Sequence, residues 1–277
     1  MVVINNDSGL TEAHYSGTSL SEIYVGRHLV WPVPIEPEPP VVGNKLTYSM
    51  SGSTYTIPCN ESDVLTFAEI IQDITNRGGH IYNVMPLTDA IVGDCVTELH
   101  PLCFASCSAL TSVTLSNNVN EIDESAFKDC VTLPSIVLPS GITKITDSLF
   151  VSNYELASVN IPSGVTSIDT NSFFDCLSLL DITIPSGVTE IGSGAFRTSN
   201  WTINDRYQYD KMIHMASART VTCLATTPPI LGVGALSIIS GSIDIATYKI
   251  YVPSDSLNAY KTAENWSYIA DRIYPIT

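Results

Sequence analysis

The chain has 277 residues, 44% of them hydrophobic, and a formal net charge of −16. This composition can fill one extended core, while the acidic excess argues against nucleic-acid binding, which needs clustered lysine and arginine. No stretch of about 18 apolar residues occurs, so no membrane span is expected. Residues 1–9 lack the basic and apolar regions of a secretory signal, so we expect a protein that is assembled without an export step.

The first predicted element is a short β-hairpin in residues 21–33, SEIYVGRHLVWPV. Apolar residues alternate at Ile23, Val25, Leu29 and Trp31 on the two sides of a glycine, which is typical of paired strands. An isolated hairpin is marginally stable in water, so we expect it to dock on another protein. The alternative is a tail that packs on its own chain. The residues expected to make the attachment are Ile23, Tyr24, Val25, Leu29, Val30 and Trp31.

This IYVG…LVWP string resembles short N-terminal segments in structural proteins of tailed phages that infect gut Bacteroidales. The resemblance implies attachment to a virion through the N-terminus. Between Pro32 and Pro40, five of nine residues are proline, a composition that favours an extended spacer. A proline-rich ligand for a partner domain is the alternative.

Residues 45–83 predict two short strands, near Leu46 to Met50 and Thr54 to Pro58, followed by a helix. We expect Ser62 or Asp63 to cap this helix and the glycines after Arg77 to end it. Its predicted apolar stripe is Leu65, Ala68, Ile71 and Ile74. Such an amphipathic helix is suited to cover the open end of a repeat stack.

Four contiguous 23-residue units follow, starting at Val96, Val119, Ile142 and Val165, and a fifth starts at Val188. A fixed period of this length indicates a solenoid, in which each unit buries its apolar face against its neighbours. The columns that recur are Leu99, Ile122, Ile145, Ile168, Ile191; Phe104, Phe127, Phe150, Phe173, Phe196; and Cys107, Cys130, Asn153, Cys176. Each unit also carries an alternating strand whose outward side chains are small and polar, such as Ser112 and Thr114.

These columns resemble the BspA-like leucine-rich repeats, whose pattern reads roughly LxxIxIPxxVxxIxxxAFxxC; residues 179–196 follow it closely. The resemblance implies an α+β leucine-rich-repeat solenoid and a binding role without catalytic residues, as in surface adhesins and phage structural proteins. A stretch with Cys223, Tyr251 and Trp266 resembles the C-terminal cap of such arrays. The expected domains are an anchoring segment (1–33), a linker (34–43), an N-terminal cap (44–87), the solenoid (88–219) with an insertion at 201–219, and a C-terminal cap (220–277).

The insertion breaks the repeat register and concentrates aromatic and basic side chains, which are common in recognition loops. The display-loop residues predicted to contact a partner are Trp201, Arg206, Tyr207, Tyr209 and Lys211. Packing of these rings on the solenoid is an equal alternative. Past residue 220, strands and a last helix carrying Leu257, Tyr260 and Ala263 are expected to close the stack.

Cys95, His100, Cys103 and Cys107 invite a zinc hypothesis, but the repeat register already explains the cysteines, since Cys107 lies in the Cys130 column. The seven cysteines predict buried free thiols and folding in a reducing cytoplasm. Asp123, Asp147 and Asp169 are expected to recur at one turn position, with a solvated role favoured over a calcium ladder.

The sequence thus predicts a non-enzymatic structural and binding protein of a phage virion, a head or tail fibre or decoration protein, without cofactor or metal. The expected partners are other virion proteins and a host-surface protein or glycan, with several copies on the particle. A secreted or surface-bound bacterial adhesin is the alternative.

Overall fold

The computed structural model describes residues 43–60, 62–77, 86–198, 220–236 and 249–277 with their side chains, and the backbone of residues 10–16, 19–25 and 28–31. The chain divides into two compact units, Met1–Val42 and Gly43–Thr277. In the first unit, β1 (Leu10–Ser16), β2 (Ser19–Val25) and β3 (His28–Trp31) form an antiparallel sheet in that order. Residues 21–33 thus contribute β2 and β3, while β1 was not foreseen. Apart from Gly43, the predicted linker lies outside the described residues.

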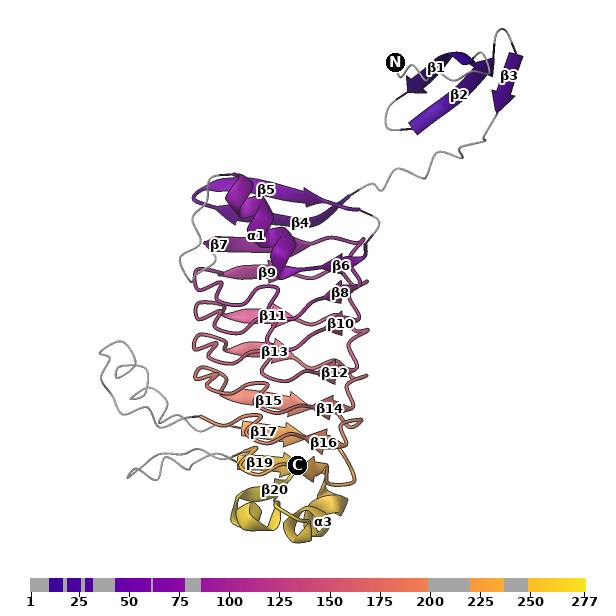
Figure 1. Cartoon of the computed structure of the whole chain (residues 1–277). Coiled ribbons are helices and arrows are strands. Elements are labelled where there is room, and N and C mark those ends of the chain that lie inside the picture. Colours follow the sequence, from indigo (N-terminus) through magenta and orange to yellow (C-terminus); the bar gives the residue numbers. More distant parts are fainter. Residues whose placement is uncertain are drawn as a thin grey trace. The chain divides into compact units, whose positions relative to one another are not determined.

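The second unit is a stack of repeats in which each repeat adds one strand to each of two rows (Figure 1). The strands of the first row are β6 (Val64–Leu65), β8 (Glu98–Leu99), β10 (Glu121–Ile122), β12 (Lys144–Ile145), β14 (Ser167–Ile168), β16 (Glu190–Ile191) and β18 (Ile230–Leu231). The row consists of two parallel sheets, β10-β8-β6 and β12-β14-β16-β18. Within the regular repeats, paired residues are one 23-residue period apart, as for Ile145 and Ile168.

The second row contains longer strands and continues to both ends of the unit (Figure 1). Its members are β4 (Asn44–Met50), β5 (Ser53–Pro58), β7 (Leu87–Val92), β9 (Ser112–Thr114), β11 (Ser135–Val137), β13 (Ser158–Asn160), β15 (Asp181–Ile184), β17 (Thr220–Cys223), β19 (Lys249–Val252) and β20 (Ile273–Pro275). The segments β5-β4-β7-β9, β11-β13 and β15-β17-β19-β20 follow the order of the stack.

The core between the two rows is built from the predicted columns. The isoleucine and leucine column and the phenylalanine column are buried throughout, with Phe104, Phe127 and Phe150 fully inaccessible. The five phenylalanine rings stack with centroid separations between 5.1 and 5.8 Å and interplanar angles of at most 19°. Each of the three middle rings therefore stacks on the ring of the repeat before and after it, as the resemblance to leucine-rich repeats implied.

Between the rows, each repeat makes a turn that bonds directly to the next turn. The amide of Phe104 donates to the carbonyl of Ala126 at 2.8 Å, and the amide of Phe150 donates to that of Ser172 at 2.7 Å. In each of the first four repeats, two residues of this turn adopt the left-handed backbone conformation, which directs the turn's amides toward the carbonyls of the next repeat. In one of these columns the residues are Leu102, Ser125, Ser148, Asn171 and Gly194, with φ between 53° and 65°. Polar residues and glycine recur there because they tolerate this conformation.

The N-terminal end combines a hairpin with one helix. Strands β4 and β5 are joined by Ser51 and Gly52, both at positive φ, as a two-residue hairpin turn of type I′ requires. Helix α1 (Phe67–Asn76) follows, with Ile70 and Ile74 buried. The expected caps, Ser62 and Asp63, were wrong: the helix begins after Thr66, whose hydroxyl accepts from the Glu69 amide in a capping box. The pattern missed this because Val64 and Leu65 form a strand, and Ala68 is exposed rather than part of the stripe.

At the C-terminal end the register resumes after the insertion. Asp181 pairs with Thr220, 39 residues later instead of 23, and the amide of Phe196 donates to Ala235 as the earlier phenylalanines do to theirs. The last elements are η1 (Ser254–Ser256), α3 (Leu257–Thr262), η2 (Ser267–Arg272) and β20. Trp266 is fully buried and donates to the Pro229 carbonyl at 2.8 Å. Among the described residues, no helix has the length and hydropathy needed to cross a membrane.

Candidate functional site

The outer face of the second row of strands is a regular surface of the second unit. The alternation of each strand places the outward side chains in two columns, whose members are exposed or partly exposed. The first column is Asp89, Ser112, Ser135, Ser158, Asp181, Thr220 and Lys249; the second is Ile91, Thr114, Val137, Asn160, Thr183, Thr222, Tyr251 and Tyr274. We call this surface the outer sheet face. The predicted outward residues of the four repeats are all exposed.

The middle of the outer sheet face carries short side chains and few charges. Val137 is its most exposed apolar residue, with 74% of its surface accessible. The Asn160 amide accepts from the Leu138 amide at 2.7 Å and donates to the Leu138 carbonyl at 3.2 Å, so it ties two neighbouring strands together. The side chains in this part of the face are short, and they are suited to hydrogen bonding rather than to deep burial.

The C-terminal end of the same face carries aromatic side chains. The rings of Tyr251 and Tyr274 lie 6.0 Å apart at an angle of 41°, and the Lys249 ammonium group lies 6.0 Å from the centre of the Tyr274 ring. Aromatic rings beside a cation are the residue types that dominate binding energy at interfaces. This group was not predicted, although Tyr251 and Tyr274 are one 23-residue period apart, because the repeats were followed only as far as Val188. The alternation of buried Ile250 and Val252 around Tyr251 was the signal that could have found it.

The predicted attachment residues fall on the paired strands of the first unit. The register places Ile23 opposite Trp31 and Tyr24 opposite Leu29, so the apolar residues of the string lie on neighbouring strands. Only their backbone is described. The predicted display loop, with Trp201, Arg206, Tyr207, Tyr209 and Lys211, lies outside the described residues. Both sets therefore remain predictions.

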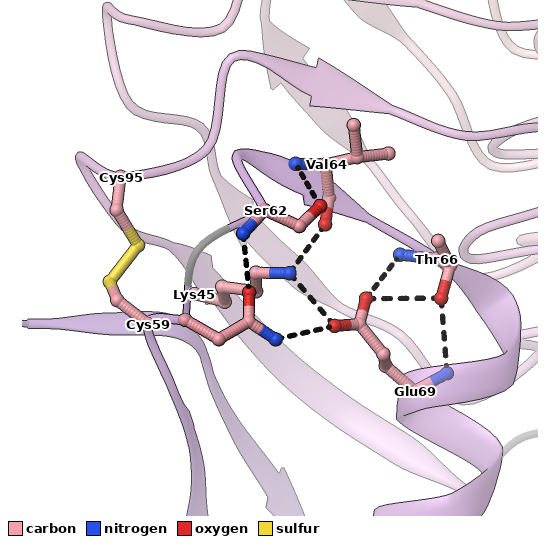
Figure 2. Close-up of polar contacts among 8 residues, drawn as sticks. Lys45, Cys59, Ser62, Val64, Thr66, Glu69 and Cys95 are labelled. Atoms are coloured by element: carbon pink, nitrogen blue, oxygen red, sulfur yellow. Dashed lines mark hydrogen bonds and ion pairs between the residues drawn. A yellow bond between two sulfur atoms is a disulfide. The ribbon is translucent and has the colours of Figure 1, made fainter. Parts of the chain in front are cut away.

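A buried polar cluster holds the N-terminal end of the stack together (Figure 2). The side chain of Lys45 is fully buried, and its ammonium group donates to the Val64 carbonyl at 2.7 Å and to Glu69 at 2.8 Å. The other carboxylate oxygen of Glu69 accepts from the Thr66 amide at 2.9 Å. Burial opposes ionisation of Glu69, but the hydrogen bonds from Lys45 and Thr66 outweigh it and hold its pKa below the ordinary value. This cluster joins β4, β6 and α1, so its role is structural.

A disulfide between Cys59 and Cys95 lies beside that cluster (Figure 2). It joins the end of β5 to the segment between β7 and β8, across a sequence separation of 36 residues. The prediction that all seven cysteines are free thiols was therefore wrong for this pair, which lies outside the repeat columns. Both residues are only partly buried. A disulfide of this kind forms and persists in an oxidising environment, which also removes the reason to expect folding in a reducing cytoplasm.

The other five cysteines form no disulfide among the described residues and are buried, as expected. In their column, the thiols of Cys130 and Cys176 donate to the carbonyls of Phe104 and Phe150 at 3.2 and 3.1 Å, and the Asn153 amide donates to Phe127 at 2.8 Å. This position in the repeat therefore favours a buried side chain that can donate a hydrogen bond to a backbone carbonyl of the preceding repeat. Burial raises the pKa of the Cys103 thiol well above its ordinary value, so this thiol is a poor metal ligand. With Cys95 in the disulfide, the four residues of the rejected zinc hypothesis do not form one site.

The acidic residues of the first row divide into two groups. Near its N-terminal end, ligand atoms of Glu98, His100 and Asp123 all lie within 4.8 Å of one another. Partial burial, together with repulsion from Asp123 and Glu121, raises the pKa of Glu98. Farther along the row, Lys144 forms a 2.7 Å ion pair with Asp169.

The expected aspartate ladder is interrupted at its middle position. Asp123 and Asp169 follow the core isoleucines of their repeats, and their amides donate to Leu99 and Ile145. The prediction that Asp147 shares this position was wrong, because Thr146 follows Ile145 there and Asp147 is one residue late. A continuous carboxylate ladder is therefore not formed.

Two hollows lie in the described part of the stack. One, of about 380 Å³, is polar and is lined by Asn120, Glu121, Ile122, Gly141, Thr143, Lys144 and Thr146. The other, of about 230 Å³, lies at the C-terminal end and is lined by Leu231, Gly232, Val233, Gly234, Ala235, Leu236, Asn265, Tyr268 and Ile269. Neither lining contains a histidine or cysteine, so neither offers a nucleophile with an adjacent imidazole base.

Comparison with known proteins places the repeats in a family. Residues 78–202 match the model of the BspA type leucine rich repeat region with six copies. No curated protein sequence matches the chain. Among solved structures, a leucine rich cell surface protein from Faecalibacterium prausnitzii is 19% identical, with 76% of each chain covered and a TM-score of 0.38.

Two further solved structures are similar. A leucine-rich repeat protein from Bacteroides ovatus is 21% identical, with 77% of this chain and 59% of that chain covered and a TM-score of 0.40. A leucine rich repeat protein from T. pallidum is 18% identical, with 69% and 84% covered and a TM-score of 0.38. Repeats of this kind generally occur in non-enzymatic binding proteins. The sequence of residues 78–202 is therefore similar to BspA type leucine rich repeats, which are typical of surface and adhesin-like proteins.

Proposed function

We propose that this chain is a non-enzymatic display protein of a tailed-phage virion, a head or tail fibre or decoration protein that binds a host-surface protein or glycan. The observation that carries the proposal is a rigid sheet face with small polar side chains that ends in Tyr251, Tyr274 and Lys249. Such a face gives flat hydrogen-bonding area plus a few side chains that supply binding energy. It requires no bound cofactor.

The attachment half of the proposal rests on the first unit. Strands β2 and β3 carry the string that resembles N-terminal segments of phage structural proteins, and they belong to a compact unit separate from the repeats. Residues Ile23, Tyr24, Val25, Leu29, Val30 and Trp31 are proposed to contact another virion protein. This arrangement lets one end bind the particle while the other is displayed.

A secreted or surface-bound bacterial adhesin is the second candidate, and the Cys59–Cys95 disulfide favours it. Disulfides persist outside the reducing cytoplasm. A virion released by lysis meets that condition only after release, whereas an exported adhesin meets it as it folds. The two candidates share the outer sheet face as the binding surface.

Recognition is tested with fluorescently labelled full-length chain and intact Bacteroidales cells. Replacing Tyr251 or Tyr274 with alanine is expected to weaken cell binding about tenfold, the usual effect of removing an aromatic side chain that supplies binding energy. Tyr268→Ala is the matched control, because Tyr268 is 85% exposed on η2, outside the sheet. Equal binding by all three variants would remove the outer sheet face from the proposal.

Attachment is tested by deleting residues 1–33 in a phage that encodes the chain and measuring the chain in purified particles. The deletion is expected to abolish incorporation while the repeat unit keeps its circular dichroism spectrum. Full incorporation would contradict the assigned role of the N-terminal residues. Recovery of the intact chain in the bacterial envelope, and none in particles, would favour the adhesin. Deleting residues 201–217 tests the display loop in the same assay.

A further inference from the structure

We propose that Glu98, His100 and Asp123 form a binding site for a divalent transition-metal cation, with Zn²⁺ as the defining probe. One carboxylate oxygen of each acid and one ring nitrogen of the histidine lie within 4.8 Å of one another. Zinc bonds to these atoms are about 2.0–2.2 Å long, and in tetrahedral geometry two ligand atoms on one ion are about 3.3–3.6 Å apart. Binding therefore requires the three side chains to move closer together by up to about 1.5 Å.

The backbone that carries the three residues is fixed by the repeat register. Glu98 lies on β8, and His100 is two residues later on the same side of the extended chain. Asp123 follows β10 and occupies the His100 position one period later. The amide of His100 donates to Leu65 at 3.0 Å, and the amide of Asp123 donates to Leu99 at 2.9 Å. A site held on paired strands needs little reorganisation to bind an ion.

The local charge also favours a cation. Glu121 and Asp63 add two more carboxylates whose charges act on Glu98, and His100 is the group that opposes them. Two repeats later, Lys144 occupies the Glu98 column and forms an ion pair with Asp169 at 2.7 Å. There the negative charge of the aspartate is balanced by a lysine of the chain itself. The middle of this row thus carries a fixed cation, whereas its N-terminal part carries an imidazole within a group of acids.

The mixed donor set selects the type of metal. An imidazole nitrogen with two carboxylates suits Zn²⁺ and its first-row neighbours, whereas Ca²⁺ takes six to eight oxygen ligands. Three protein ligands leave at least one coordination position open. This site shares only His100 with the cysteine-containing set excluded above, and it uses no cysteine.

The test measures Zn²⁺ binding to the full chain by isothermal titration calorimetry and compares variants. His100→Ala and Glu98→Gln are expected to weaken binding at this site by about tenfold or more, since even partners that only orient a ligand contribute 10–100-fold. Glu190→Gln is the matched control, because Glu190 is exposed in the Glu98 column but lies beyond the cluster. The comparison of variants separates this site from histidines elsewhere in the chain.

A transplant uses the period of the chain itself. Lys144→Glu combined with Thr146→His recreates the same three ligand types around Asp169 and is expected to add one binding equivalent. The proposal is overturned if the parent chain binds no Zn²⁺, or if His100→Ala binds Zn²⁺ as tightly as the parent does. It is also overturned if Ca²⁺ binds as tightly as Zn²⁺ and the His100→Ala change does not weaken Ca²⁺ binding. Failure of this test leaves the outer sheet face untouched, because the two surfaces belong to different rows of strands.

Discussion

At the scale of single residues, one position in each repeat adopts a left-handed backbone conformation, and the residue types found there differ in how well they tolerate it. In the left-handed column, Leu102 adopts φ +62°, where the following repeats have Ser125, Ser148, Asn171 and Gly194. A leucine side chain pays a steric cost in this conformation, and 46% of its surface is exposed. Leu102→Asn is therefore expected to raise the free energy of unfolding by about 1 kcal/mol, measured by chemical denaturation.

Gly194→Ala is the opposing control for that prediction. A Cβ atom at Gly194 would come within 2.5 Å of the Asn171 side-chain oxygen, at φ +65°. We expect this variant to be less stable than the parent. A stabilised Gly194→Ala, or a destabilised Leu102→Asn, would contradict the conformational argument.

A second residue-scale prediction concerns Asn153, which interrupts the cysteine column. Its amide nitrogen makes the column's hydrogen bond, but its side-chain oxygen is buried without a partner among the described atoms. A buried unpaired acceptor costs roughly 1–3 kcal/mol. Asn153→Cys keeps a donor, as Cys130 and Cys176 do, and removes the orphaned oxygen, so it is expected to raise stability by about 1 kcal/mol. The reverse change, Cys130→Asn, should lower the midpoint of urea unfolding.

At the scale of elements, the disulfide secures the N-terminal end of the stack. It encloses α1 within a 36-residue separation, so it restricts the unfolded chain substantially. The Cys59→Ser, Cys95→Ser double variant is expected to lose about 2–4 kcal/mol. Hydrogen exchange should locate the loss in β5 and α1 rather than in the central repeats. Unchanged exchange in α1 would show that the bond contributes nothing there.

Acid is expected to weaken the same end. Burial opposes ionisation of Asp73, but hydrogen bonds from Arg77 and Tyr48 outweigh it, so its pKa is lowered like that of Glu69. Groups with lowered pKa values stabilise the fold above their unfolded values, 3.8 and 4.5, and this contribution is lost as the pH falls through the folded values. Melting temperature against pH should therefore fall less steeply in acid for Asp73→Asn than for the parent. Asp181→Asn, on the outer sheet face, is the control for simple loss of charge.

At the scale of the whole repeat unit, stability is a sum of contacts between neighbours. Phe150 lies in the middle of the stack, with ring contacts to Phe127 at 5.8 Å and Phe173 at 5.4 Å. Phe150→Ala is expected to cost about 3–5 kcal/mol and to split thermal unfolding into two transitions, one for each side. A single sharp transition in calorimetry would show that the unit unfolds cooperatively despite its linear arrangement.

The parts of this architecture that were predictable are those that repeat. The burial of Phe104 and Ile122 could be predicted because a residue of the same type recurs every 23 residues in each column. Stacked repeats need side chains of similar size at a buried position in every unit. The Cys59–Cys95 bond was not foreseen, because it joins residues outside the repeat columns. The Tyr251–Tyr274 pair was also missed, although the two tyrosines are one 23-residue period apart, because the repeats were followed only as far as Val188. Thr66 was missed for a local reason: a two-residue strand precedes the helix and carries the apolar residues assigned to it.

Strand β15 pairs directly with β17 although 39 residues separate Asp181 from Thr220. The backbone ladder therefore continues across the change in residue count, and the additional residues lie between Thr198 and Thr220 in the sequence. We expect changes in the length or composition of this segment to alter the surface of the molecule and to leave the stacked core in place.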